Sequence, residues 1–514
     1  MTDPARYALI PEPTHLTPRA ASFRIAGETT VFIAPGAETA GRALERAIGP
    51  SLPGNAQDAD IRISIVPEGQ GTNGYRLDIS TDRIDILGTD ATGAFYGVQT
   101  LRQLLPPDSE APERPGRTLT VPCVQIEDFP RFAWRGLMLD VARHFMPVDF
   151  LRRVIDVLSL HKLDVLHLHL TDDQGWRIEV PGYPRLTEVS AWRTETVIGH
   201  DSAVPTWDLR YDGRSHGGFY STAELSDLVA YAEERHVTII PEVDMPGHMQ
   251  AAIAAYPDLG NGIAEPEVRR RWNISTQILS LNEPAMRFCR DVLTEVTRIF
   301  PSEFIHCGGD EVPTDEWRMS PQVQQRIKDL GLPDETALQG WFTRQIAAFL
   351  DEHGRRLVGW DEVLDARPLP ANCVVMPWRG DTAVRNALNA GVDVVMTPAQ
   401  HLYLNYNQST DVHAEPLAIG GFVPLSMVHA YTPGRFGDRV LGAQAQLWTE
   451  YIDSPELAEY MLFPRLCAFA EAVWRQGTSP DAPDFARFLE RLRPHLSRLD
   501  ALGVRYRPLD AKPD

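Results

Sequence analysis

The sequence predicts an α/β protein, a (β/α)₈ barrel preceded by a smaller α/β domain. From Trp134 onward, short apolar and β-branched runs alternate with amphipathic helical stretches, the pattern of a parallel sheet wrapped by helices. The runs are almost continuously apolar, as in strands buried on both faces. The 514 residues exceed the ~150 of one average domain, and a closed barrel takes up ~250 or more. We therefore expect an accessory domain at 1–130 and a barrel domain at 131–514.

The barrel strands are expected in eight apolar runs: Gly136–Val141, Val165–Leu170, Thr238–Val243, Glu303–Cys307, Arg356–Trp360, Val374–Pro377, Val392–Met396 and Ala443–Leu447. Helical spacing of apolar residues predicts helices at Val148–His161, Thr222–Glu234, Pro284–Phe300, Glu335–His353, Thr382–Ala390 and Pro455–Ala470. Two connections, Gly182–His216 and Asn405–Phe436, are too long for turns. Long loops of a barrel usually build the rim of the active site.

The first 130 residues combine short β-rich pieces with one helical stretch. The β-rich pieces, separated by Gly, Pro and Asp, are Thr30–Ala34, Ile61–Val66, Tyr75–Ile79 and Arg83–Gly88. The helix is expected at Ala91–Leu105. The segment Pro106–Pro115 is rich in proline and charge, which predicts an exposed connection near a domain boundary.

Composition narrows the class of protein. Hydrophobic residues make up 43% and charged residues 23%, as in ordinary globular proteins, and the net charge is −21. That charge disfavours nucleic acid and anionic membranes as partners, because both would repel the chain. The first residues carry no signal-peptide pattern and no apolar stretch is long enough to span a membrane, so a cytoplasmic location is expected. Five scattered cysteines without CxxC spacing favour buried free thiols over a disulfide framework.

Residues suited to chemistry gather at the predicted strand ends, where a barrel forms its active face. The segments are Arg135 with Asp140–His144, Thr171–Trp176, Pro241–His248, His306–Glu311, Gly359–Glu362, Pro377–Trp378, Tyr403–Asn405 and Leu447–Glu450. This mixture suits carbohydrates, because aromatic faces cover sugar rings while charged groups bind hydroxyls in pairs. The alternative for the tryptophans is that they only fill the barrel mouth.

The sharpest feature is Gly308-Gly309-Asp310-Glu311. The glycines allow a tight turn at the strand end. Two adjacent carboxylates repel each other, which raises the proton affinity of one and yields an acid able to protonate a leaving group. The alternative is a solvated acidic turn or a helix cap.

Four motifs in order resemble the family 20 β-N-acetylhexosaminidases: Arg135–Phe145 (RGLMLDVARHF), Leu168–Trp176 (LHLTDDQGW), Pro241–His248 (PEVDMPGH) and His306–Glu311 (HCGGDE). The resemblance covers about Phe132 to Trp474. The end of the first domain, Gly93–Leu101, resembles the accessory domain that precedes the barrel in that family.

The resemblance implies an exo-acting, retaining enzyme that removes terminal non-reducing GlcNAc or GalNAc, with the substrate's acetamide as nucleophile and an oxazolinium intermediate. It implies Glu311 as general acid and base, Asp310 as the partner of the acetamide N–H, and Tyr403 as donor to the acetamide oxygen. Asp172 and His248 are implied as a pair that supports the acid.

The same resemblance implies the substrate-binding residues. Trp360, Trp378 and Trp448 are implied to enclose the acetamide methyl and the sugar ring, and Arg135 and Glu450 to bind hydroxyls of the terminal sugar. No metal or cofactor is implied, and the expected partners are N-acetylhexosamine-terminated oligosaccharides or glycoconjugates.

Asn405 departs from the family pattern, since many relatives carry Asp there. An amide still binds a hydroxyl, and it both donates and accepts. The change leaves the preference between gluco and galacto sugars open.

Two alternatives follow from the residues. His167-Leu-His169 places two imidazoles on one face of a strand, as in metal-dependent amidohydrolases. A non-catalytic sugar-binding barrel is the other, although it predicts a damaged acid site, whereas Asp310, Glu311 and Tyr403 are all present.

Overall fold

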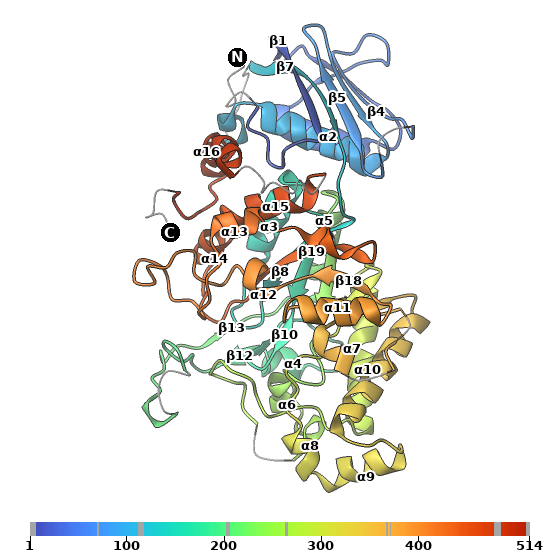
Figure 1. Cartoon of the computed structure of the whole chain (residues 1–514), viewed down its shortest axis with the longest axis vertical. Helices are drawn as coiled ribbons and strands as arrows, with labels where there is room; N and C mark the ends of the chain where they lie inside the picture. The colour runs from blue at the N-terminus through green and yellow to red at the C-terminus, as the bar shows by residue number, and fades with distance from the viewer. Residues whose placement is uncertain are drawn as a thin grey trace.

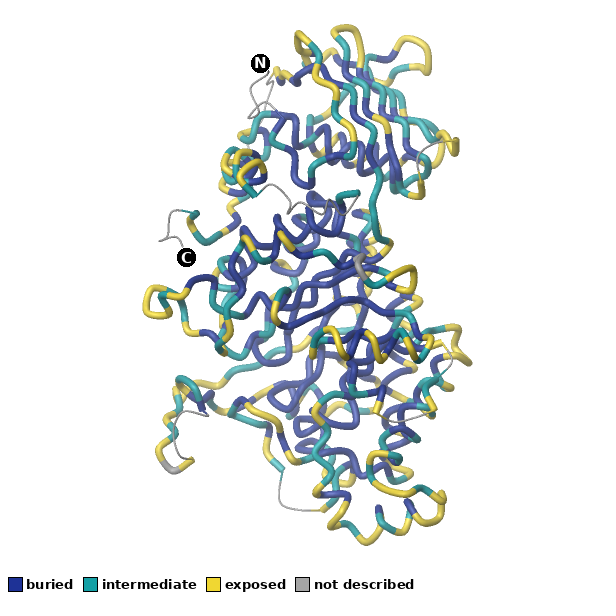
Figure 2. Tube along the Cα trace, in the orientation of Figure 1, coloured by how far each residue is buried: buried dark blue, intermediate teal, exposed yellow. Residues whose placement is uncertain are grey.

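A computed structural model describes residues 7–68, 71–111, 118–201, 206–262, 266–365, 368–370, 372–476 and 485–509. A sheet domain formed by the N-terminal part of the chain stacks on one end of a larger barrel (Figure 1). Each part has a buried interior, and the exposed residues concentrate in loops and on outer helix faces (Figure 2). The expected fold class is confirmed.

The first domain is a mixed sheet in the order β1-β7-β5-β6-β4-β2-β3. Its strands are β1 (His15–Ile25), β2 (Thr30–Ile33), β3 (Leu52–Pro53), β4 (Ile61–Ile65), β5 (Tyr75–Ile79), β6 (Ile84–Gly88) and β7 (Leu119–Asp128). Two helices, α1 (Glu38–Ile48) and α2 (Ala91–Leu104), pack on each other. Helix α2 starts at Asp90, whose carboxylate accepts a hydrogen bond from the Gly93 N–H at 2.8 Å. This helix lies between the sheet and the barrel and is therefore buried on almost every side (Figure 1).

Two strands of this sheet, β1 and β7, are not evident from the sequence. Strand β1 contains Pro18, and its register with β7 shifts between Pro18 and Ser22, so its apolar residues do not alternate. Strand β7 contains Pro122 and is buried along most of its length. The two pair although about 100 positions separate them, a contact that no local pattern encodes.

Eight parallel strands close the barrel within the described residues. They are β8 (Trp134–Asp140), β9 (Val165–His169), β14 (Thr238–Glu242), β15 (Phe304–His306), β16 (Arg356–Trp360), β17 (Val374–Met376), β18 (Asp393–Met396) and β19 (Val440–Leu447). Each coincides with one of the predicted runs, with shifts of a few residues at the ends. The main outer helices are α3 (Val148–Leu160), α5 (Thr222–Glu233), α7 (Glu283–Ile299), α10 (Glu335–Glu352), α11 (Asp381–Asn389), α14 (Pro455–Leu462) and α15 (Arg465–Trp474). No described helix is long and apolar enough to cross a membrane.

The C-terminal helices differ from the prediction. The single helix expected at Pro455–Ala470 is two, α14 and α15, because Pro464 lacks the N–H that would continue the hydrogen-bond ladder. A further helix, α16 (Phe485–Ala501), is not expected from the sequence. It returns to the first domain, where Arg498 pairs with Glu110 at 2.7 Å.

The structure also corrects the prediction that the segment Pro106–Pro115 is an exposed connection near a domain boundary. Its first part is a short 3₁₀ turn, Pro107–Glu110, in which the Glu110 side chain is almost fully buried between Arg102 and Arg498. The chain then continues into β7, so this segment lies inside the first domain, not at its boundary. Residues 112–117 lie outside the described residues.

Arg135 is also placed differently from the prediction. It stands near the start of β8, fully buried at the junction of the two domains. Its guanidinium donates to Tyr96 Oη at 2.7 Å and to the Lys162 carbonyl at 2.8 Å, and it pairs with Asp164 at 2.7 Å. The expectation that Arg135 binds sugar hydroxyls is therefore wrong, because the active face lies at the opposite strand ends.

Candidate active site

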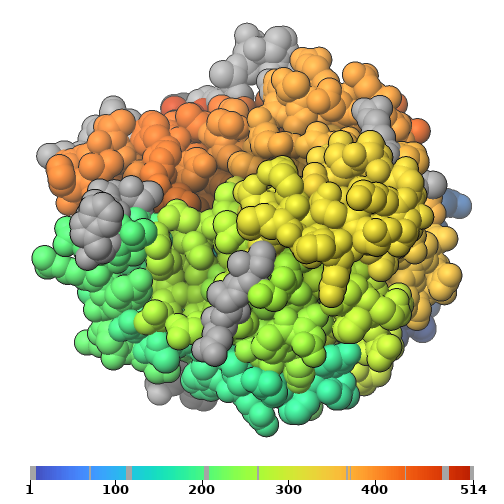
Figure 3. Space-filling model, turned by 90° about the horizontal axis from the view of Figure 1, so that it is seen from below, coloured from blue at the N-terminus to red at the C-terminus, as the bar shows by residue number. Residues whose placement is uncertain are grey.

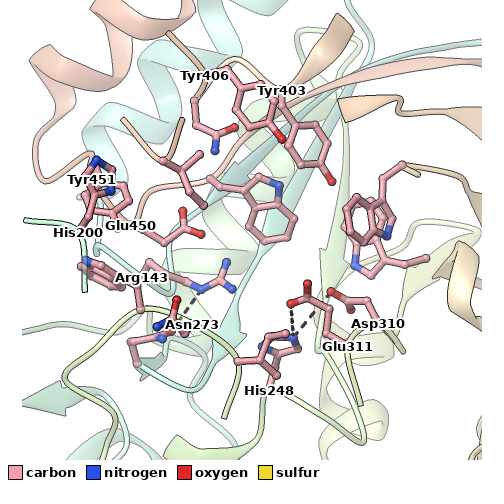
Figure 4. A pocket seen from close by; sticks show the side chains of 18 residues that line it. Arg143, His200, His248, Asn273, Asp310, Glu311, Tyr403, Tyr406, Glu450 and Tyr451 are labelled. Carbon is pink, nitrogen blue, oxygen red and sulfur yellow. Dashed lines mark hydrogen bonds and ion pairs between the residues drawn. The ribbon is translucent and has the colours of Figure 1, made fainter. Parts of the chain in front are cut away.

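A cavity of about 370 Å³ opens at the carboxyl ends of the barrel strands. The segments that border this end, coloured green, yellow and orange, occupy the face of the molecule turned away from the sheet domain (Figure 3). Within the cavity, acidic and basic side chains from different strands point toward a shared space (Figure 4). The lining residues are Arg143, Gln174, His200, His248, Trp272, Asn273, Ile274, Asp310, Glu311, Trp360, Trp378, Tyr403, Asn405, Tyr406, Ile419, Trp448, Glu450 and Tyr451.

The turn after β15 presents the two adjacent acids. Gly308 and Gly309 have φ of +62° and +94°, which favour glycine. A Cβ at Gly308 would lie 1.7 Å from Asp244 Oδ1, so no other residue fits there. Asp244 Oδ1 accepts the Gly309 N–H at 3.0 Å and thereby holds the turn against the segment that follows β14. Glu311 itself has φ of +47°, a left-handed conformation that costs a non-glycine residue about 1 kcal/mol and is typical of functional sites.

Asp310 and Glu311 share one neighbour, His248 (Figure 4). Its Nε2 lies 3.7 Å from Asp310 Oδ2 and 3.8 Å from Glu311 Oε2. Burial, the Asp244 carboxylate and Glu311 together raise the pKa of Asp310 well above its usual value, although His248 opposes them. The raised proton affinity expected from two adjacent acids thus falls on Asp310. Asp310 Oδ1 is buried and accepts no hydrogen bond from any residue that the structure describes.

Asp172 lies behind His248 and does not line the cavity. Its Oδ1 is 3.2 Å from His248 Nδ1, and its Oδ2 is 2.8 Å from both Arg143 Nη2 and His169 Nε2. Burial opposes ionisation of Asp172, but Arg143 and His248 outweigh it and hold its pKa well below the usual value. Burial would likewise lower the pKa of His248, yet Asp172 keeps it well above normal. His248 is therefore a cation facing the acid pair.

Arg143 is the arginine that reaches the cavity. It follows the end of β8 and is braced by Asp140 at 3.2 Å, by Asp172 at 2.8 Å and by the Gln174 side chain at 3.2 Å. Its guanidinium carbon also lies 4.9 Å from the centre of the Trp448 ring. Contacts with described residues thus occupy three of its five N–H groups and leave two for a ligand.

Four aromatic side chains form one wall of the cavity. Trp360 and Trp448 lie 5.8 Å apart between ring centres, Trp378 and Tyr403 are stacked at 6.5 Å, and Tyr403 and Trp448 are 6.4 Å apart. The Trp360 indole donates to Glu242 Oε1 at 3.0 Å, which fixes its ring. Burial raises the pKa of Tyr403 well above normal and keeps its hydroxyl protonated as a donor.

Glu450 and Asn405 complete the polar part of the wall. Burial raises the pKa of Glu450, an effect that the Arg143 charge opposes. Asn405 is 5% exposed, and its side-chain carbonyl oxygen has no hydrogen-bond partner among the described residues. Both groups are therefore available to hydroxyls of a ligand.

The cavity brings together nine of the residues expected from the sequence: Asp310, Glu311, His248, Tyr403, Asn405, Trp360, Trp378, Trp448 and Glu450. It also contains Arg143, Trp272 and Asn273, whose roles the sequence analysis missed. Arg143 lies in the strand-end segment Asp140–His144, so the rule that the active face lies at strand ends would have selected it over Arg135. Trp272 and Asn273 come from a connection without a recognisable pattern.

His167 and His169, on which the amidohydrolase alternative was based, do not line the cavity. His167 Nε2 and His169 Nδ1 both contact Glu242 Oε2, at 3.0 and 2.6 Å. Among the described residues, His167, Glu242 and His306 also bring possible metal-ligand atoms within 4.8 Å of one another. All three are fully buried in the barrel interior, and none of them lines the cavity. The five cysteines are buried and form no disulfide bond, as expected.

Comparison with known proteins agrees with this geometry. Residues 132–477 match the model of the glycosyl hydrolase family 20 catalytic domain, and residues 6–129 match family 20 domain 2. A β-hexosaminidase of Porphyromonas gingivalis is 39% identical over 98% of this chain, and the chain spans 65% of that relative. A β-hexosaminidase of Vibrio furnissii is 35% identical over 91% of the chain and 77% of its own length.

Solved structures show the same architecture. An exo β-N-acetylglucosaminidase of Vibrio harveyi, in complex with N-acetylglucosamine, superposes with a TM-score of 0.85 at 33% identity, covering 98% of this chain and 78% of its own. An N-acetyl-β-hexosaminidase of Streptomyces plicatus superposes with a TM-score of 0.82 at 32% identity, covering 98% of this chain and 96% of its own. The two matched regions, the relatives and the acid pair at a strand end agree with one another. This chain belongs to glycosyl hydrolase family 20.

Proposed function

We propose that this chain is an exo-acting β-N-acetylhexosaminidase that removes terminal non-reducing GlcNAc or GalNAc with retention, using the substrate's own acetamide as nucleophile. The observation that carries the proposal is Asp310 Oδ1, a buried acceptor that no described residue satisfies, beside four aromatic rings. Buried hydrogen-bond acceptors are almost always paired, so we infer that a ligand supplies the donor for this oxygen. An acetamide supplies an N–H for Asp310 and a methyl group for the aromatic wall.

In the first step the acetamide oxygen forms a bond to C1 while the bond from C1 to the leaving oxygen breaks. Glu311 transfers its proton to that oxygen, and the sugar becomes a bicyclic oxazolinium ion. The raised pKa of Asp310 belongs to the site without a substrate charge; the acetamide N–H and the positive charge that develops on the ring nitrogen favour its carboxylate form, which accepts the N–H and stabilises that charge. Tyr403 donates to the acetamide oxygen and aims it at C1. Positioning of this kind replaces a bimolecular encounter and lowers the barrier by several kcal/mol.

In the second step water adds to C1 from the side that the leaving group vacated. Glu311, now a carboxylate, takes one proton of the water, and the bond from C1 to the acetamide oxygen breaks. The configuration at C1 is retained because it has been inverted twice. Arg143, Glu450 and Asn405 would bind the hydroxyls of the terminal sugar, which closes the cavity to longer chains at that end.

The test is a panel of p-nitrophenyl β-glycosides of GlcNAc, GalNAc and glucose. We expect turnover of the acetamido sugars and none above background of the glucoside, with the β-anomer appearing first by NMR. No turnover of either acetamido sugar would refute the enzyme function. Comparable turnover of the glucoside, or a covalent sugar–protein bond trapped in mass spectrometry, would refute substrate assistance.

A further inference from the structure

A chain of buried charged groups connects the barrel interior to the acid pair. Glu242 ends β14, His169 ends β9, and these two residues are paired in register. The His169 ring bridges two carboxylates, with Nδ1 at 2.6 Å from Glu242 Oε2 and Nε2 at 2.8 Å from Asp172 Oδ2. Asp172 in turn holds His248, whose free Nε2 faces Asp310 and Glu311.

The geometry points to His169 as a positioning residue of the acid site, a permanent cation that fixes the orientation and charge of Asp172 and thereby of His248. This inference rests on the proposed function of the same site. It concerns residues that do not touch the substrate, since neither His169 nor Glu242 lines the cavity.

The contacts of His169 indicate that it is doubly protonated. Both of its nitrogens lie at hydrogen-bonding distance from carboxylate oxygens, and an ionised carboxylate only accepts, so each nitrogen must donate. Glu242 stays ionised because donors surround it: burial would raise its pKa, but the histidines His306, His169 and His167 hold it well below normal. In the same way burial would lower the pKa of His169, yet Glu242 and Asp172 keep it well above normal.

The position of Asp172 explains why this cation matters. Asp172 is fully buried and shares its Oδ2 between His169 and Arg143, which leaves Oδ1 directed at His248. Without His169, one of these anchors is lost and the carboxylate can rotate away from His248. The His169 ring also stands edge-on to Trp448, 4.9 Å between centres, so it supports one wall of the cavity as well.

Removing the His169 charge must also change the protonation of the acid pair. His169 faces Glu242, Asp172, Asp140 and His167, while His248 faces Asp172, Asp173, Asp244, Asp310 and Glu311. Loss of one positive charge makes this whole group more negative and favours proton binding by its carboxylates. Both limbs of the pH–activity profile should therefore move to higher pH.

Two substitutions of His169 separate the hydrogen bond from the charge. The amide nitrogen of His169→Gln can replace Nε2 and keep the bond to Asp172 without the charge, whereas that of His169→Asn replaces Nδ1 and loses this bond. The matched control is His167→Gln, on the same strand and the same carboxylate but without a contact to Asp172. The readouts are kcat, KM and the pH profile on p-nitrophenyl β-N-acetylglucosaminide, below the unfolding temperature of every variant.

We expect His169→Asn to lower kcat at least 10-fold with KM within 3-fold of wild type. His169→Gln should lower kcat less but move the pH profile upward by about half a unit or more, and His167→Gln should do neither. If the two His169 variants match His167→Gln in kcat and pH profile, the inference is wrong, whereas inactive wild type would refute the proposed function instead.

A measurement on the wild type covers the case in which the variants do not fold. With ¹⁵N-labelled histidine, NMR should show one imidazole, assigned as His169 through its two carboxylate-bonded N–H protons, that stays doubly protonated from pH 5 to 9. A neutral His169 anywhere in that range would overturn the inference.

Discussion

Arg143→Lys tests which arginine binds the substrate. Arg143 uses three N–H groups on Asp140, Asp172 and Gln174 and directs two toward the cavity, with its flat face near Trp448. Lysine keeps the charge but offers three donors from a single point and cannot stack in the same way. If its ammonium stays with the two carboxylates, it has no donor left in the right direction for a sugar hydroxyl.

The size of the loss in kcat/KM follows from the energy of at least one hydrogen bond to the substrate that lysine does not make. One hydrogen bond between a charged donor and a hydroxyl is worth about 1.5 to 3 kcal/mol, and 1.4 kcal/mol is a factor of ten. We therefore expect kcat/KM to fall about 10- to 150-fold on p-nitrophenyl β-N-acetylglucosaminide, measured under steady-state conditions at 20 °C. The charge balance around Asp172 persists, so the protein should remain folded.

Arg135→Lys is the matched control, the same substitution at the arginine that the sequence alone suggested. Arg135 is fully buried and bonds Tyr96, Asp164 and the Lys162 carbonyl. Its replacement should lower the melting temperature by several degrees but leave kcat/KM of the folded enzyme within 2-fold. The reverse pattern, an unchanged Arg143→Lys and a KM defect in Arg135→Lys, would refute the assignment.

Further predictions concern the acid, the tyrosine, the intermediate and stability. Glu311→Gln should abolish turnover of natural oligosaccharides, which have poor leaving groups, while calorimetry still detects binding of N-acetylglucosamine; near-normal rates would contradict its role as the acid. Tyr403→Phe should lower kcat about 10- to 100-fold in the same colorimetric assay, because the acetamide oxygen loses its donor, and an unchanged kcat would exclude that donor role. An N-acetylglucosamine thiazoline, which resembles the oxazolinium ion, should inhibit strongly, and absence of inhibition at millimolar concentration would count against substrate assistance. Burial and the Asp310 and Asp361 charges raise the pKa of Glu362 to about 8, so its contribution to stability falls as pH rises from about 4.5 to about 8. Glu362→Gln, which does not titrate, should therefore gain in melting temperature over wild type by more at pH 8.5 than at pH 4.5, and equal differences at both pH values would contradict the raised pKa.

The local pattern of the sequence was enough to predict the eight strands of the barrel and most of its outer helices. Strands such as Arg356–Trp360 are short, apolar and bounded by helical segments, so their periodicity indicates them without tertiary information. The acid pair after Gly308 and Gly309 was equally predictable, because the carboxyl ends of the strands in such a barrel face the active side. Elements held by distant partners were not: β1 pairs with β7 across about 100 residues, and α16 packs against the first domain.

The sequence by itself determined the fold class, the position of the acids and most of the cavity wall, since these depend on short-range patterning and on one rule of barrel topology. The family resemblance implied Arg135 although the strand-end rule favours Arg143, and the tertiary structure showed which of them reaches the cavity, because Arg135 lies near the start of β8 and Arg143 lies beyond its end. Only the tertiary structure brought Glu242, His169, Asp172 and His248 into one chain. When eight strands close into a ring, residues far apart in the sequence become neighbours, which no local pattern encodes. Buried charges among these neighbours must then pair, because an unpaired buried charge is costly.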